Sequence, residues 1–308
     1  MEQLKDSYLL QFLMICVMVV FACTKVTLQG AVSRNHLRSS SDSVLFNALL
    51  FAVMAIVMAL IFPMEMFGTA GWILAFCGAV GSFAFQVCYA LALQKGPVSL
   101  SVLIVNFQVL VVTSFSIIAF HESVYLTQLI GILFLIVSMF LSIKKDDSEK
   151  KFSGTWLILL LVSLIGTASA TIFMKSFTKW FSEGEGQDNG FVVMMYVFAS
   201  AMAFVWYAVG ALSKQKKKAT FGFGNLHVWA YILGIGIVLG IFQKLYMTGM
   251  SIIDGGFLFP TYTGLQSVTM TLVGILLFKD KLTGKQKLGV LCGVLCVVLM
   301  NIRWIALF

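Results

Sequence analysis

Long, almost uncharged runs of apolar residues occupy most of this sequence. A helix needs about 20 residues to cross a hydrocarbon core of roughly 30 Å. Runs of that length cover 8–29, 44–62, 72–94, 97–119, 124–143, 154–175, 190–212, 227–248, 256–278 and 285–308. Because the runs are apolar throughout and do not alternate with polar residues, they predict helices and exclude a barrel. We therefore expect an all-α integral membrane protein with ten transmembrane helices.

The second half of the sequence repeats features of the first half. At an offset of about 158 residues, Gln108 aligns with Gln266 and Glu122 aligns with Asp280. With five helices in each copy, an odd number, the second copy enters the membrane from the opposite side. The sequence thus predicts two inverted five-helix repeats, residues 1–148 and 149–308, joined by the charged linker 144–153. Inverted repeats are typical of secondary transporters.

Basic residues are concentrated on one side of this predicted topology. The loops opposite the chain termini contain Arg34, Arg38, Lys95, Lys144, Lys145, Lys150, Lys151, Lys214, Lys216, Lys217, Lys218, Lys279, Lys281, Lys285 and Lys287. The terminus side contains Lys5, Lys179 and Arg303. Since cytoplasmic loops carry the excess of Lys and Arg, this distribution predicts that both termini lie outside the cytoplasm.

Composition argues against several other classes of protein. Only 11% of the 308 residues are charged, whereas a soluble domain carries about 25%. The net charge of +8 arises from short loops between apolar runs, so it does not indicate a nucleic-acid partner. The six cysteines lie within apolar runs without metal-binding or redox spacing. The sequence contains no HExxH, GxSxG or Walker-type motif, so we expect neither an enzyme nor a cofactor or metal site.

Two short connections carry a resemblance to a known family. Phe120-His121-Glu122-Ser123 is followed by Gln128 and Gly131, and 278–284 is followed by Gln286 and Gly289. Together with Lys25 and the run Tyr89–Pro97, these positions resemble the EamA-like, ten-helix transporters of the drug/metabolite transporter superfamily, over nearly the whole chain. The resemblance implies a bacterial plasma-membrane transporter. It also implies cytoplasmic termini, contrary to the charge distribution, so the sequence leaves the orientation open.

Polar side chains within the predicted spans are the candidates for a solute site. Sites in inverted-repeat transporters lie near the membrane midplane between the halves. The candidate substrate-binding residues are Lys25, Gln86, Tyr89, Asn106, Gln108, Lys175, Gln243, Lys244, Tyr246, Tyr262 and Gln266. Each glutamine or tyrosine has an alternative structural role as an interhelical hydrogen-bonding group. Each lysine has the alternative of extending to the interface near a helix C-terminus.

The distribution of charge in the spans suggests a class of solute. Three lysines and no carboxylate lie well inside the predicted spans. A cavity of that kind favours an anionic, zwitterionic or neutral solute over a cation. We therefore expect a secondary transporter of a small polar metabolite, amino-acid-like, carboxylate-bearing or neutral, within the lipid bilayer. The alternatives are an organic-cation exporter and a non-transporting sensor or assembly component. A homodimer is possible through the small residues of the last helix.

Overall fold

The computed structural model describes residues 7–35, 40–95, 98–123, 125–141, 154–212, 226–278 and 283–302. Every element of regular secondary structure in these ranges is an α-helix. The helices are α2 (Tyr8–Asn35), α3 (Ser40–Ile61), α4 (Thr69–Lys95), α5 (Val98–Asn106), α6 (Gln108–Phe120), α7 (Leu126–Leu141), α8 (Gly154–Trp180), α9 (Glu185–Leu212), α10 (Leu226–Ile252), α11 (Gly255–Phe278) and α12 (Gly284–Met300). The predicted linker 144–153 and Asp280 lie outside the described residues.

Seven stretches of the described chain are long and apolar enough to cross a membrane. They comprise most of α2, α3, α4, α8, α9 and α10, and the stretch Leu103–Phe120, which includes the end of α5 and all of α6. Helix α7 is a shorter apolar helix. Exposed leucines, isoleucines and valines recur along these helices, as expected where a helix faces lipid rather than water. The predicted all-helical, membrane-spanning architecture is thus confirmed at this level.

The predicted fourth span differs from the structure in one respect. We predicted a single run over 97–119, but the helix breaks at Phe107. There the Phe107 N–H bonds the Ile104 carbonyl, and the Leu110 N–H bonds the Phe107 carbonyl. These tight i→i+3 bonds replace the α-helical pattern for one turn. The break leaves Asn106 as the last residue of α5 and Gln108 as the first residue of α6.

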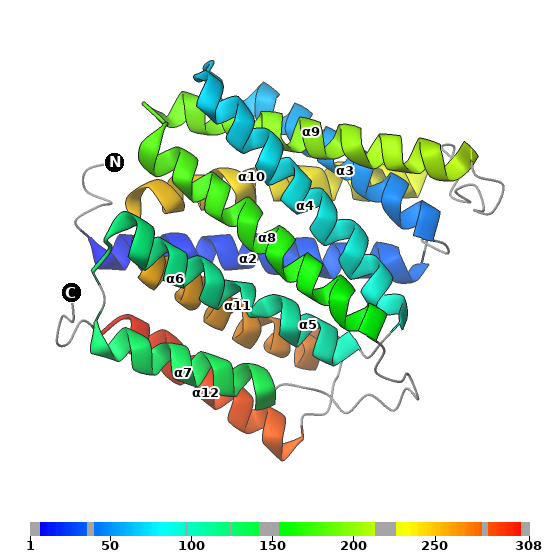
Figure 1. The fold of residues 1–308 in the computed structure, drawn as a ribbon. Helices are drawn as coiled ribbons and strands as arrows, with labels where there is room; N and C mark the ends of the chain where they lie inside the picture. The colour runs from blue at the N-terminus through cyan, green and yellow to red at the C-terminus, as the bar shows by residue number, and fades with distance from the viewer. Residues whose placement is uncertain are drawn as a thin grey trace.

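The helices form a bundle with two paired edges. Helices α3 and α9 pack together at one edge, and α7 and α12 at the other (Figure 1). Between them α4 packs along α8, and α2 packs along α10; α6 contacts α8, and α11 contacts α2. Helix α2 begins and α12 ends at the same end of the bundle, where α6 and α8 also end (Figure 1). We call this the terminal end.

Two sequence patterns predict local features of the fold. Thr283 followed by Gln286 three residues later predicts a capping box, and the structure contains it at the start of α12, where each side chain bonds the other residue's backbone N–H. Glycines four residues apart, Gly236/Gly240 and Gly289/Gly293, predict close helix packing, and the structure has close contacts at two of them. A Cβ on Gly236 would lie 2.6 Å from the Val53 side chain, and one on Gly293 would lie 2.8 Å from the Val268 side chain. These distances leave no room for a side chain.

Helices α4 and α8 approach each other closely where they cross. A Cβ on Gly81 would lie 2.6 Å from the carbonyl oxygen of Gly166, and a Cβ on Gly166 would lie 2.7 Å from the carbonyl oxygen of Gly81. The obstructing atoms are backbone atoms, which cannot rotate away. The crossing therefore requires glycine on both helices.

Candidate functional site

A buried ion pair joins three elements at the terminal end. The Lys175 ammonium of α8 donates to Glu122 Oε1 at 2.5 Å. Glu122 Oε2 accepts from the Ser116 hydroxyl at 3.0 Å and from the Gly255 backbone N–H at 2.6 Å. The two charged side chains are 1% and 4% exposed. We call Ser116, Glu122, Lys175 and Gly255 the ion-pair cluster.

The position of Gly255 explains how the cluster is assembled. Its N–H is at the start of α11, where the helix dipole favours a carboxylate. A Cβ on Gly255 would lie 2.2 Å from Ser116 Oγ and 2.6 Å from Lys175 Nζ. Only glycine at this position lets the backbone approach Glu122 so closely.

The conformation of His121 directs Glu122 into the bundle. His121 follows α6 as its C-cap with φ 52° and ψ 40°, in the left-handed region. A residue in that conformation ends a helix and reverses the chain. His121 itself is exposed, whereas the next residue, Glu122, is buried. The turn thus places one side chain outside and the next inside.

Substitution of His121 tests this role of the turn. We expect His121→Val to destabilise the protein by about 1–2 kcal/mol, because a β-branched residue tolerates the left-handed region poorly. His121→Asn should be close to neutral, since asparagine adopts this conformation readily. Thermal unfolding of the purified variants in detergent measures the difference. Equal stability of the two variants would contradict the proposed role.

Lys244 forms a second, less buried cluster near the start of α9. Its ammonium pairs with the Glu185 carboxylate and donates to the Asn189 side-chain oxygen at 2.9 Å. Asn189 in turn donates to the Pro63 carbonyl at 2.9 Å, which ties α9 to the α3–α4 connection. The ammonium also lies 5.7 Å from the centre of the Phe62 ring.

The sequence predicted that no carboxylate lies near the lysines inside the spans. The contacts of Lys175 and Lys244 correct that expectation. The sequence placed Lys175 and Lys244 in spans and placed all acidic residues in loops or at span ends. In the structure, loop and helix-end carboxylates fold inward, so each lysine has its own anionic partner. The structure therefore does not show Lys175 or Lys244 as an unpaired ammonium facing a solute.

Three of the predicted residues gather with Tyr196 in one cluster. Tyr246 of α10 and Tyr262 of α11 have ring centres 5.6 Å apart. Gln243 donates from Nε2 to the Tyr196 hydroxyl of α9. The Gln243 oxygen is buried and has no hydrogen-bond partner among the described residues. We call Tyr196, Gln243, Tyr246 and Tyr262 the tyrosine cluster.

The remaining predicted residues lie outside that cluster. Tyr89 stacks on Phe85 with ring centres 5.5 Å apart and packs against a small buried cluster that includes Trp156 at the start of α8. The Gln108 side-chain oxygen is buried without a partner among the described residues. The others are partly exposed, namely Lys25 on α2, Gln86 on α4, Asn106 on α5 and Gln266 on α11. No described contact joins these residues to the tyrosine cluster.

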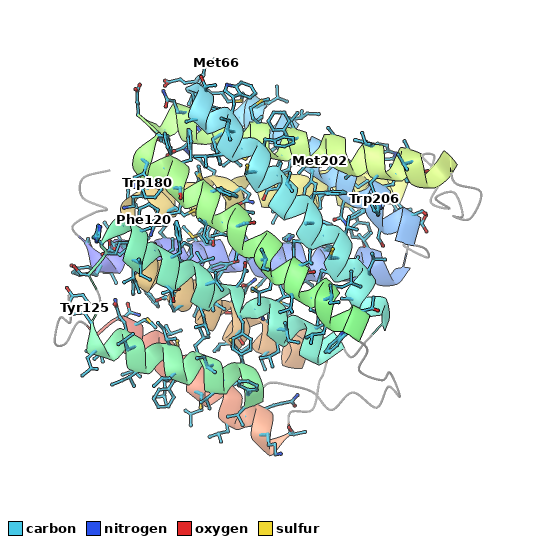
Figure 2. All side chains as sticks on the ribbon, in the orientation of Figure 1. Met66, Phe120, Tyr125, Trp180, Met202 and Trp206 are labelled. Carbon is cyan, nitrogen blue, oxygen red and sulfur yellow. The ribbon has the colours of Figure 1, made fainter. Side chains whose placement is uncertain are left out.

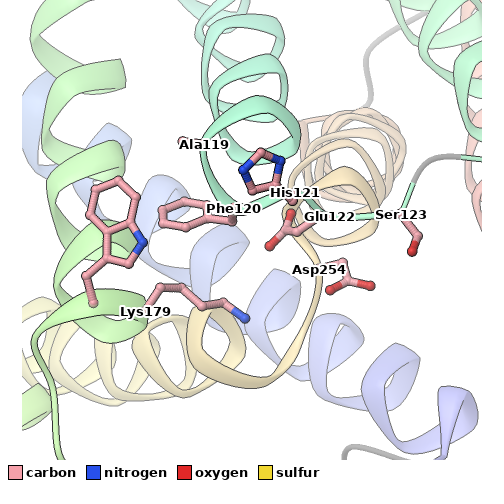
Figure 3. A pocket seen from close by; sticks show the side chains of 8 residues that line it. Ala119, Phe120, His121, Glu122, Ser123, Lys179 and Asp254 are labelled. Atoms are coloured by element: carbon pink, nitrogen blue, oxygen red, sulfur yellow. The ribbon is translucent and has the colours of Figure 1, made fainter. Parts of the chain in front are cut away.

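A polar pocket of about 400 Å³ opens beside the ion-pair cluster. It is lined by Ala119, Phe120, His121, Glu122, Ser123, Lys179, Trp180 and Asp254 (Figure 3). Phe120 and Trp180 lie next to each other at the ends of α6 and α8 (Figure 2), with ring centres 4.9 Å apart. This pocket brings Glu122 to the border between the buried cluster and the surroundings of the bundle.

A second pocket, of about 420 Å³, lies on the outer side of the α4–α8 crossing. Its lining is largely apolar, and two lining residues, Phe76 and Ile165, are 50% and 64% exposed. A groove of this composition facing outward suits lipid rather than a polar solute. We therefore place the candidate site inside the bundle.

The most important residues that the site prediction omitted are Glu122 and Tyr196. Glu122 appeared only as part of the repeated connections, since acidic residues outside the spans were not considered for the interior. Its alignment with Asp280 was the available signal, because a repeated acidic residue marks a repeated structural position. For Tyr196 no such signal existed. Its role depends on the packing of α9 beside α10, which the sequence does not specify.

Comparison with known proteins agrees with this architecture. Residues 10–144 match the EamA-like transporter family, which belongs to the drug/metabolite transporter superfamily. The predicted resemblance is thus confirmed over residues 10–144, and together with the apolar helices the match identifies an integral membrane protein. No curated protein matches the sequence. One crystal structure, described only as that of a protein, superposes with a TM-score of 0.72 at 15% identity, covering 95% of this chain and 96% of that chain. At that identity the likeness concerns the fold alone.

Proposed function

We propose that this protein is a secondary transporter that carries a small polar solute by alternating access. The ten predicted spans would form two inverted five-helix repeats, with the solute bound at the tyrosine cluster. The observation that carries the proposal is the unpartnered Gln243 oxygen, which is buried while the same side chain donates to the Tyr196 hydroxyl. A buried polar atom without a partner costs several kcal/mol in a membrane. A bound solute that donates a hydrogen bond would satisfy it.

The packing of the helices supports the inverted repeat. If the halves are exchanged, α2 takes the place of α8 and α4 takes the place of α10. The packing of α4 on α8 then becomes the packing of α10 on α2, and both occur. Likewise, the contact of α4 with α9 corresponds to that of α10 with α3, and the contact of α6 with α8 corresponds to that of α11 with α2.

Stacked aromatic pairs repeat in the same way. Phe85 and Tyr89 of α4 stack at 5.5 Å and 20°, and Phe242 and Tyr246 of α10 stack at 5.3 Å and 18°. In each pair a glutamine follows the phenylalanine directly and lies three residues before the tyrosine. These glutamines are Gln86 and Gln243. Equivalent geometry at equivalent positions is expected of a duplicated transport fold.

The paired lysines narrow the class of solute. Because Lys175 and Lys244 have carboxylate partners, they supply no net positive charge to the tyrosine cluster. The cluster offers hydroxyl groups, an amide and aromatic faces instead. A neutral or zwitterionic metabolite suits these groups. An organic cation is the second candidate, since Tyr246, Tyr262 and Phe242 form a group of rings that could stabilise a positive charge.

A thermal-shift screen tests the binding site. We expect a neutral or zwitterionic metabolite to raise the unfolding temperature of the purified protein, and Tyr246→Ala or Tyr262→Ala to weaken its binding at least about tenfold, the loss of roughly 1.4 kcal/mol. Phe204→Ala on the exposed side of α9 is the control and should bind normally. Stabilisation by lipophilic cations alone would favour the second candidate. Equal binding by all variants would exclude the tyrosine cluster as the site.

The charge distribution supports an orientation for this transporter. We propose that the terminal end faces away from the cytoplasm, because the helix ends that adjoin most of the basic residues in the sequence lie at the opposite end. Labelling of the exposed Ser123, replaced by cysteine, with a membrane-impermeant reagent in intact cells tests it. Labelling only after the cells are permeabilised would place the terminal end in the cytoplasm.

A further inference from the structure

The polar pocket beside the ion-pair cluster is lined by residues of both predicted halves. Phe120, Glu122 and Ser123 come from the end of α6 and the connection that follows it. Lys179 lies in the last turn of α8, and Asp254 precedes α11. The volume of about 400 Å³ is typical of pockets that bind small molecules. Its polar lining distinguishes this pocket from the groove of similar size that faces lipid.

Two charged groups of opposite sign face the pocket without partners of their own. The Lys179 ammonium and the Asp254 carboxylate form no ion pair or side-chain hydrogen bond with any part of the chain that the structure describes. Figure 3 shows the Lys179 side chain extending toward Asp254 across the pocket. Both charges are therefore available to a ligand.

The third charge next to the pocket is already neutralised. The Glu122 carboxylate is paired with the Lys175 ammonium and accepts two further hydrogen bonds from neutral donors. Because the opposite charge of Lys175 is so close, Glu122 contributes little net charge to the pocket. The uncompensated charges of the lining are thus one ammonium and one carboxylate.

An aromatic wall borders the same pocket. The rings of Phe120 and Trp180 have centres 4.9 Å apart, and Trp180 is 55% exposed. A ligand whose apolar part covers these rings removes apolar surface from water. The His121 imidazole and the Ser123 hydroxyl add hydrogen-bonding groups to the lining.

The signs of the two free charges select the class of ligand. A simple anion is attracted by Lys179 but repelled by Asp254, and a simple cation meets the reverse. A molecule with both an ammonium and a carboxylate satisfies both groups and brings no net charge into the pocket. A compact zwitterion with an apolar part therefore matches the whole lining.

The ion-pair cluster lies between this pocket and the tyrosine cluster. The Lys175 ammonium is 5.5 Å from the centre of the Phe120 ring, in the wall of the pocket. It is also 5.3 Å from the centre of the Phe259 ring, and Phe259 contacts Tyr246 with ring centres 6.4 Å apart. A solute in the pocket is thus on the outer side of the ion-pair cluster, and the tyrosine cluster is on the inner side.

We propose that this pocket is a second, outer solute site, which binds a compact zwitterion between the Lys179 ammonium and the Asp254 carboxylate, with the apolar part of the solute against Phe120 and Trp180. The proposal deepens the proposed function and rests on it, because it places the pocket on the path of the solute to the tyrosine cluster. It also selects the zwitterionic class over the neutral one.

Protection of a cysteine in the pocket tests the proposal. Ser123→Cys is introduced into the full chain after the native cysteines are replaced, and the protein is placed in lipid nanodiscs. The rate of its modification by a polar maleimide is measured at neutral pH with three probes. They are L-leucine, which is a zwitterion, isopentylamine, which lacks the carboxylate, and isocaproate, which lacks the ammonium.

Leucine should protect the cysteine best. We expect saturating leucine to slow the modification at least about fivefold, and each analogue to bind about fivefold more weakly than leucine, the usual effect of losing one hydrogen bond. The apolar part is the same in all three probes, so the comparison reports on the charged groups alone.

Substitution of the two charged residues should change which probe binds best. Lys179→Gln should weaken binding of leucine and improve binding of isopentylamine, because Asp254 then acts alone. Asp254→Asn should weaken binding of leucine and improve binding of isocaproate. A general structural effect would not change the preference in opposite directions. Glu183→Gln and Lys285→Gln remove exposed charges outside the pocket and should behave like the parent protein.

Several outcomes would overturn the proposal. They are no protection by leucine, equal protection by all three probes, and an unchanged preference in Lys179→Gln and Asp254→Asn. Tyr246→Ala combined with Tyr262→Ala should retain protection, because the tyrosine cluster is a separate site, and its loss there would also contradict the outer site. Intact protection in a protein that fails to transport would instead count against the proposed function alone.

Discussion

Replacing Lys175 with methionine is expected to lower the free energy of unfolding by about 3–5 kcal/mol. Methionine fills similar space but leaves the Glu122 carboxylate buried without its cation. Ser116 and Gly255 still donate to that carboxylate, but neither carries a charge. The loss is measured by chemical unfolding of the purified protein in mild detergent.

Two further variants separate the ion pair from general effects of lysine removal. Lys179→Met, on the same helix about one turn later, alters an exposed lysine and should leave stability nearly unchanged. Adding Glu122→Gln to Lys175→Met should recover most of the loss, because the remaining group is then neutral. A double variant as unstable as the single variant would contradict the buried ion pair.

Replacing Gly166 with leucine is the second change with a large expected effect. A Cβ at this position meets the Gly81 carbonyl oxygen at 2.7 Å and the Phe85 nitrogen at 3.0 Å. Because both are backbone atoms, α4 and α8 must separate along their whole crossing. We expect a loss of about 3 kcal/mol, the upper part of the usual range for overpacking, measured by the same unfolding experiment.

Gly234→Leu is the matched control for the glycine crossing. Gly234 lies within α10, and a Cβ there meets no atom within 4 Å. Leucine favours a helix over glycine by roughly 0.8–1 kcal/mol, so this variant should be as stable as the parent protein or slightly more stable. Equal losses at Gly166 and Gly234 would show that the effect does not come from helix packing.

The helices could be predicted because membrane-length apolar runs admit few structures. The predicted starts of α2, α8 and α12 lie within one residue of those observed. The capping box at Thr283 followed from local chemistry, and the structure contains it. The break at Phe107 was missed because neither glycine nor proline marks it. It arises from two i→i+3 backbone hydrogen bonds, which the side-chain sequence does not predict.

The candidate site was predicted in part. Gln243, Tyr246 and Tyr262 carry groups that only the interior could satisfy, and the structure gathers them with Tyr196. The ion pairs of Lys175 and Lys244 were not predicted, because ion pairing depends on how loops and helix ends fold back. Glu122 is 53 residues from Lys175 in the sequence, and the left-handed turn at His121 brings them together. Such a contact is determined by tertiary packing rather than by hydrophobic pattern.

Exchange of a labelled solute across proteoliposomes tests the central claim most directly. The solute is the one that stabilises the purified protein most strongly in the thermal-shift screen. We predict that liposomes containing the parent protein accumulate it in exchange for internal unlabelled solute, and that Phe204→Ala does the same. Tyr246→Ala combined with Tyr262→Ala should reduce the rate to that of empty liposomes. Uptake by the parent protein no faster than by empty liposomes, or undiminished uptake by the double tyrosine variant, would contradict transport through this site.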